Sequence, residues 1–116
     1  MLDGLDQIAW KRLSHAYGPA TDVPALIRRL TNGSSDEREE ALGELHGNIW
    51  HQGTVYEATP YAVPFLLEVV TDPRIPDRHY VLSLLQAIAE GWLACQKRGP
   101  QPEKVRAGLC VRAAGE

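Results

Sequence analysis

Apolar side chains recur at steps of three and four residues through most of the first 95 positions. Leu5, Ile8 and Leu13 follow this spacing near the start, as do Leu26 and Leu30 further on. Such spacing places side chains on one face of an α-helix, and no stretch alternates apolar and polar residues as a half-buried strand does. The pattern predicts helices over residues 5–17, 22–32, 35–50, 60–71 and 77–98, with no strand between residues 23 and 95.

Stop and start signals separate these predicted helices. Gly18-Pro19 ends the first helix, Asp22 is a suitable N-cap for the second, and Ser34-x-x-Glu37 fits a capping box for the third. Thr59-Pro60 opens the fourth helix, and Lys97-Arg98-Gly99-Pro100 is a stop signal for the last one. The chain therefore divides into short helices joined by tight connections.

The chain also matches itself when it is shifted by 40 residues. Val23-Pro24-x-Leu26 falls on Val63-Pro64-x-Leu66, and seven positions between 23 and 45 are identical to those 40 residues later. A helical repeat of this length is typical of an α-solenoid, in which each unit buries its apolar face against its neighbours. We therefore predict an all-α domain over residues 1–98, with a capping helix at 5–17 and two helical hairpins at 22–50 and 60–98.

The spacing inside each unit resembles the HEAT-repeat family. A proline is followed after eight residues by Asn or Asp, and after six more by arginine, in two sets: Pro24, Asn32 and Arg38, then Pro64, Asp72 and Arg78. The resemblance covers residues 22–95 and implies two HEAT-like hairpins. Each arginine is then expected to bond to the turn of its own or the adjacent unit, since a guanidinium can satisfy helix-end carbonyls.

The resemblance also carries functional expectations. Residues 47–68 look like the connection between repeats in small bacterial HEAT-like proteins. Some of those proteins accompany toxin systems as binding or immunity partners, so the resemblance implies a protein-binding scaffold. HEAT-like repeats also occur in the phycobilin lyases, which leaves an enzyme or tetrapyrrole-handling protein as the alternative.

Composition and charge narrow the classes of partner. The 116 residues are 44% hydrophobic and 23% charged, as in globular domains. Residues 1–95 carry seven basic and thirteen acidic side chains, whereas residues 96–116 carry five basic and two acidic ones. An acidic body argues against nucleic acid as the main partner. Residues 99–116 are predicted to be a weakly ordered basic tail.

Targeting and cysteine signals are weak. The first ten residues contain neither a basic region nor a long apolar run, so they do not fit a signal peptide, and no stretch fits a membrane span. Cys95 and Cys110 do not form a disulfide framework or a metal-type spacing. The sequence therefore predicts a cytoplasmic protein.

The connection between the two units is the part richest in chemically distinctive side chains. We predict partner-binding residues there: Trp50, His51, Tyr56, Glu57 and Tyr61. Aromatic side chains fill the gaps between packed helices as readily as they anchor a partner, so both roles stay open. His46 and His51 are five residues apart and would not share a helix face, so no metal site is expected.

No enzyme motif is present, which favours a non-catalytic protein without a cofactor. The alternative, pigment handling, would need a deep pocket lined by His51, Tyr56 and Glu57. Two units are few for a solenoid. The last helix would leave apolar surface uncovered unless the tail or another chain covers it, and a homo-oligomer through the C-terminal repeat is one such arrangement.

Overall fold

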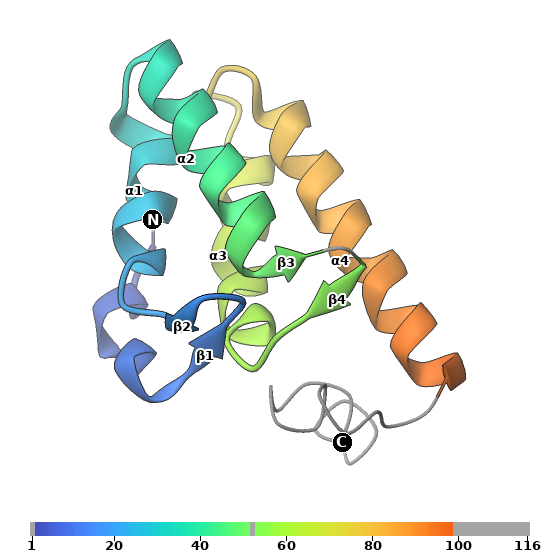
Figure 1. Ribbon diagram of the computed structural model, residues 1–116. Coiled ribbons are helices and arrows are strands. Elements are labelled where there is room, and N and C mark those ends of the chain that lie inside the picture. Colours follow the sequence, from blue (N-terminus) through green and yellow to red (C-terminus); the bar gives the residue numbers. More distant parts are fainter. Residues whose placement is uncertain (1, 52, 99–116) are drawn as a thin grey trace.

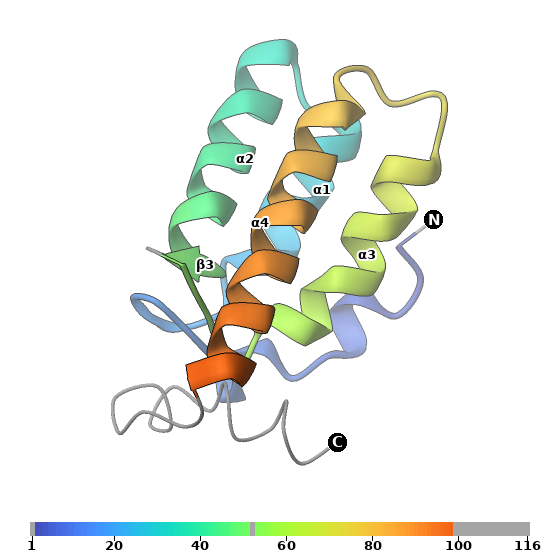
Figure 2. The ribbon, with the colours of Figure 1, turned by 90° about the vertical axis from the view of Figure 1, so that its right-hand side faces the viewer.

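Four α-helices form two antiparallel pairs that pack side by side (Figures 1 and 2). The structure, a computed structural model, describes residues 2–51 and 53–98. The first pair consists of α1 (Val23–Asn32) and α2 (Ser35–Asn48), and the second of α3 (Thr59–Thr71) and α4 (Arg78–Arg98). The helices predicted beyond residue 22 are therefore present, and α1 also contacts α3, which joins the pairs into one hydrophobic core.

The capping helix predicted over residues 5–17 is wrong. This segment forms two 3-10 turns, η1 (Leu5–Gln7) and η2 (Trp10–Arg12), followed by an antiparallel hairpin of β1 (Ser14–His15) and β2 (Gly18–Pro19). An isolated helix of this length is marginal in water, so tertiary contacts decide its conformation. The turns bury two apolar side chains in the core without a helix, those of Leu5 and Trp10.

A second hairpin joins the two helical pairs, so the prediction of no strand between residues 23 and 95 is also wrong. It consists of β3 (Trp50–His51) and β4 (Thr54–Val55), paired antiparallel. Gly53 has a φ of 80°, a left-handed conformation that glycine adopts at little cost in a tight turn. The molecule is thus rich in helix but carries two small sheets, and it is not an all-α solenoid.

The same order of elements occurs twice: a hairpin, a short helix and a second helix. We call residues 14–48 unit one and residues 50–98 unit two. The hairpins and first helices correspond at a distance of 36 residues, as from Val23 to Thr59, and the second helices start 43 residues apart, at Ser35 and Arg78. The second distance is larger than the first because α3 and the turn after it are longer than α1 and the turn after α1. The 40 residues of the sequence match lie between these two distances.

Burial follows these two distances. Leu26 and Leu30 of α1 are buried like Ala62 and Leu66 of α3, each 36 residues later. In the second helices, Ala41 and Leu45 are buried like Leu84 and Ile88, each 43 residues later. A slip of three or four residues is close to one helical turn and nearly preserves the apolar face, which explains why a 40-residue match is visible in the sequence.

The local signals predicted at the helix starts had different outcomes. The capping box predicted at Ser34 and Glu37 is confirmed, with both reciprocal hydrogen bonds present. Asp22 precedes α1 but makes no side-chain bond to the helix terminus. Pro24 lies in the first turn of α1 and corresponds to Pro60, whereas Pro64 lies inside α3.

Candidate functional site

The two hairpins lie against each other at one end of the helical pairs (Figure 1). The backbone N–H of Ala58 donates to the carbonyl of Ser14 at 3.0 Å, and the N–H of Ala16 donates to the carbonyl of Asn48 at 2.8 Å. The carboxylate of Glu57 accepts from the N–H of Ser14 at 3.3 Å. These bonds fix residues 14–19, 50–51 and 53–57 relative to one another, and we call this surface the hairpin face.

A buried histidine holds the first hairpin to both helices of unit one. His15, which is 8% exposed, donates from Nε2 to Asp22 Oδ1 at 2.8 Å. Its Nδ1 accepts from the backbone N–H of Tyr17 at 3.1 Å, which leaves the ring proton on Nε2. Asn48 donates its side-chain amide to Asp22 Oδ2 at 3.2 Å. All three polar groups are thus engaged in positioning the hairpin rather than free for acid–base chemistry.

Tyr17 is presented to solvent by this arrangement. Its side chain is 73% exposed, the largest value among the exposed large apolar side chains of the described residues. The ring of His51 meets it edge-on, with centroids 5.8 Å apart. Burial, and then the proximity of Tyr17, raise the pKa of Tyr56. Tyr17 and His51 thus bring the two hairpins into ring contact, and together with Tyr56, which directly follows β4 on the hairpin face, we call them the aromatic cluster.

Trp50 attaches the second hairpin to α4 rather than facing solvent. Its side chain is half-buried, and its indole N–H is buried without a hydrogen-bond partner among the described residues. A Cβ built on Gly91 of α4 would lie 3.4 Å from that nitrogen, 3.3 Å from Val55 Cγ1 and only 3.0 Å from the carbonyl oxygen of Gly53. The hairpin therefore packs directly against the backbone of α4.

The remaining predicted binding residues differ in position. Glu57 lies on the hairpin face, where its carboxylate bonds to the first hairpin. Tyr61 is exposed in the first turn of α3. Four of the five predicted residues thus share the hairpin face, and their role in binding stays a prediction. The predicted binding residues did not include Tyr17, which the sequence suggested only as part of the Gly18-Pro19 turn.

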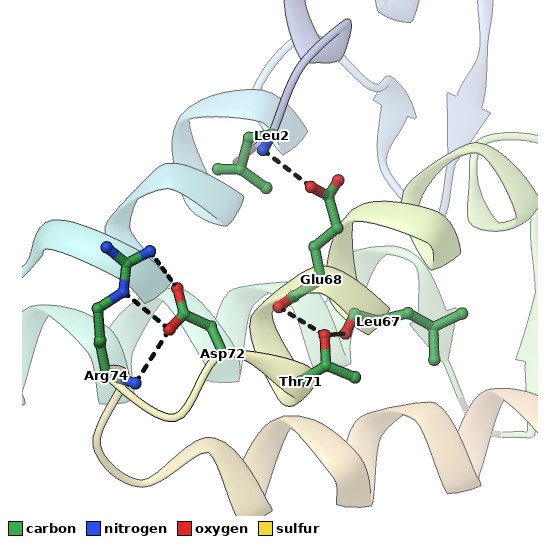
Figure 3. A network of polar contacts seen from close by, with 6 residues as sticks. All are labelled: Leu2, Leu67, Glu68, Thr71, Asp72 and Arg74. Atoms are coloured by element: carbon green, nitrogen blue, oxygen red, sulfur yellow. Dashed lines mark hydrogen bonds and ion pairs between the residues drawn. The ribbon is translucent and has the colours of Figure 1, made fainter.

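Two polar residues of the HEAT-like pattern, Arg38 and Asp72, make different kinds of contact. Arg38 donates to the carbonyl of Gly33 in its own turn at 2.8 Å and lies 3.5 Å from the carboxylate of Asp77 in the second unit. Asp72 instead binds Arg74 two residues later, as Figure 3 shows. That side-chain hydrogen bond is the main reason why the pKa of Asp72 is lowered to about 2.

Two hollows are lined by residues outside the hairpin face. The first, of about 430 Å³, lies between the turns of the two units and includes Arg38 and Asp77 in its wall. The second is an almost wholly apolar groove of about 490 Å³ between α3 and α4, and we call it the α3–α4 groove. It is lined by the following residues: Thr59, Pro60, Val63, Leu85, Ile88, Ala89, Trp92 and Leu93.

Two classes of site find no support in residues 2–51 and 53–98. That part of the chain contains no group of three or more His, Cys, Asp or Glu side chains arranged to hold a metal ion. Among the helices it describes, none combines the length and the apolar content that a membrane crossing requires. Comparison of the chain with family models, curated proteins and solved structures finds no match.

Proposed function

We propose that the chain is a non-catalytic module that binds another protein through the aromatic cluster. The observation that carries this proposal is Tyr17, a large aromatic side chain that is 73% exposed yet held by an ordered hairpin. A monomer gains nothing in core burial from placing such a ring in water. Tyrosine at the centre of an interface is, by contrast, among the commonest sources of binding energy.

Rigidity strengthens this proposal. Binding costs less free energy when the contacting side chains are already ordered before the partner arrives. The bonds from His15 to Asp22 and to the Tyr17 backbone fix the loop that bears the ring. The ring of His51 meets the ring of Tyr17 edge-on, so a partner would meet two adjacent aromatic rings whose backbones are already placed, with Tyr56 on the same hairpin face.

Charge indicates the kind of partner. Residues 1–95 carry thirteen acidic against seven basic side chains, and Glu57 lies on the hairpin face. A partner with a basic surface and an exposed apolar or aromatic residue is therefore favoured. A toxin-system partner, as the HEAT-like resemblance implies, and a cytoplasmic location belong to this proposal.

The test compares two tyrosines at opposite ends of the molecule. The immobilised chain is used to isolate a partner, and the affinity of that purified partner is then measured for Tyr17→Ala and for Tyr80→Ala. Tyr80 is 54% exposed on α4, away from the hairpin face, and serves as the matched control. Loss of a central aromatic contact costs about 2 kcal/mol, which is roughly a thirtyfold weaker affinity.

Binding and folding must be separated in this experiment. Helical circular dichroism should be unchanged in both variants, because neither ring is buried. Tyr56→Ala is expected to weaken binding as well, whereas Trp50→Ala should reduce stability because that ring packs against α4. Equal affinities of the Tyr17 and Tyr80 variants for the partner would refute binding through the aromatic cluster.

A further inference from the structure

The first hollow, of about 430 Å³, lies where the turns of the two units meet, at the end of the helices opposite the hairpins (Figure 1). We call it the turn pocket. Its volume lies within the range of about 300–1,000 Å³ that small-molecule sites occupy. Leu30, Ile75 and Val81 form an apolar part of its wall, and all three are buried members of the hydrophobic core. The turn pocket therefore offers an apolar group a place directly beside the core.

Three charged side chains also line the turn pocket. Arg38 and Glu39 come from α2, and Asp77 comes from the turn before α4. A simple anion would be repelled by Glu39 and Asp77, and a simple cation would be repelled by Arg38. A molecule that carries one charge of each sign can use all three side chains. The wall therefore favours a zwitterion with an apolar part.

Arg38 has unused hydrogen-bonding capacity on the edge of its guanidinium that faces Asp77. Its Nη1 donates to the carbonyl of Gly33 at 2.8 Å, which fixes the group in place. Its Nη2 lies 3.5 Å from Asp77 Oδ2, longer than an ordinary hydrogen bond, and its Nε is buried with no hydrogen-bond partner in the described part of the chain. Nε and Nη2 share one edge of the planar guanidinium, so a carboxylate can accept from both. This edge fits a ligand carboxylate when the Asp77 side chain turns away from it.

Asp77 is placed so that it can make this movement. Its φ is 57°, in the left-handed region that residues other than glycine rarely adopt, and residues held in this way cluster at ligand-binding sites. Its side chain is 53% exposed, so it can turn from Arg38 toward a ligand without first leaving a buried position. Because Arg38 and Asp77 lie only 3.5 Å apart, two opposite charges attached to one ligand carbon can reach both.

We propose that the turn pocket binds a free α-amino acid with a large apolar side chain. The ligand carboxylate accepts from Nε and Nη2 of Arg38, and its ammonium group donates to Asp77 and Glu39. Its side chain packs against the apolar wall that includes Leu30 and Val81. None of these residues belongs to the aromatic cluster, so this site goes beyond the proposed binding of a protein partner and does not depend on it.

Titration of the ¹⁵N-labelled full chain with L-phenylalanine, followed by amide NMR shifts, tests the proposal. The amides of Ser35, Glu39 and Val81 should shift and saturate with a Kd of about 1 mM or below, whereas those of the hairpin face should not move. Two analogues each lack one of the charges: 3-phenylpropionate has no ammonium group, and 2-phenylethylamine has no carboxylate. Each should bind at least about tenfold more weakly, because a charge-assisted hydrogen bond is lost.

Two adjacent glutamates provide a matched pair of variants. Glu39 and Glu40 are both exposed on α2, but only Glu39 lines the turn pocket. Glu39→Gln should weaken binding of L-phenylalanine about tenfold, and Glu40→Gln should leave it unchanged. Circular dichroism should show the same helical content in both variants, because both side chains are exposed. The proposal would be overturned by the absence of saturable shifts at the pocket amides, by an analogue that binds as tightly as L-phenylalanine, or by equal weakening in the two variants.

Discussion

Replacing Gly91 with alanine tests how closely the second hairpin packs against α4. In an exposed helix interior, Gly→Ala stabilises a protein by about 0.5–1 kcal/mol because alanine loses less backbone entropy on folding. At Gly91 the new Cβ would lie 3.0 Å from the carbonyl oxygen of Gly53 and 3.3 Å from Val55 Cγ1. Optimal contacts between nonbonded heavy atoms are about 3.5–4.0 Å, so the hairpin must shift.

Gly43 in α2 provides the matched control. It is exposed, lies inside a helix of similar type, and a Cβ built on it would meet nothing within 4 Å. Gly43→Ala should therefore raise the free energy of unfolding by the full helix-propensity gain of about 0.5–1 kcal/mol. Gly91→Ala has the same gain in helix propensity but also an overpacking cost of about 1–3 kcal/mol. Its free energy of unfolding should therefore be lower than that of Gly43→Ala by this overpacking cost.

Urea unfolding followed by far-UV circular dichroism measures both variants, and their m-values should equal that of the parent chain. The difference between the urea midpoints of the two variants measures the contact of α4 with the hairpin, because both variants share the same gain in helix propensity. If Gly91→Ala were stabilised as much as Gly43→Ala, the close approach of the Gly53 carbonyl to α4 would be refuted. Gly91→Val should then also be tolerated, whereas the packing described here predicts a still larger loss.

Two further predictions concern the polar contacts. Asp22→Ala should lower the free energy of unfolding by about 1–3 kcal/mol, because it leaves the His15 Nε2–H and the Asn48 amide without their acceptor; thermal and urea unfolding measure this loss. Arg74→Ala should raise the pKa of Asp72 from about 2 toward its ordinary value of 3.8, as followed by carboxyl NMR titration. Because folding lowers this pKa, the stabilisation is complete above about pH 4 and is lost as the pH falls toward 2.

Controls for these two changes lie nearby in the chain. Asp36→Ala removes an exposed carboxylate from the first turn of α2, and a stability loss as large as that of Asp22→Ala would argue against a special role for the hydrogen bonds that join His15, Asp22 and Asn48. Arg78→Ala should move the pKa of Asp72 less than Arg74→Ala, because Arg78 acts on it only through its charge. An equal shift would contradict the pairing in Figure 3.

Local signals were sufficient to predict the four helices beyond residue 22. The capping box at Ser34 and the stripe that contains Leu26, Leu45 and Leu66 specify helices whose burial the structure confirms. The register of the repeat was not recoverable in this way. A helix presents the same face every 3.6 residues, so a slip of about one turn pairs Pro24 with Pro64 instead of Pro60 and still matches apolar positions.

The hairpins were missed because each strand contains only two residues. Alternation needs four or more residues before it differs from a helical stripe, so Ser14–His15 and Trp50–His51 gave no strand signal. The candidate residues of the connection were visible as residue types, but their geometry was not. Tyr17 and His51 meet only because two hairpins 36 residues apart pack together.

The bonds that cross between the two units have a consequence for how the molecule unfolds. Arrays of helical repeats touch only their neighbours and can lose one unit while the rest persists. Here the Ile49 carbonyl, at the end of α2, accepts the buried hydroxyl of Thr59, and the Ser14 carbonyl accepts from Ala58. Detaching either half would break these bonds and expose the hydrophobic core that the two helical pairs share, so denaturation should be a single cooperative transition rather than a stepwise one.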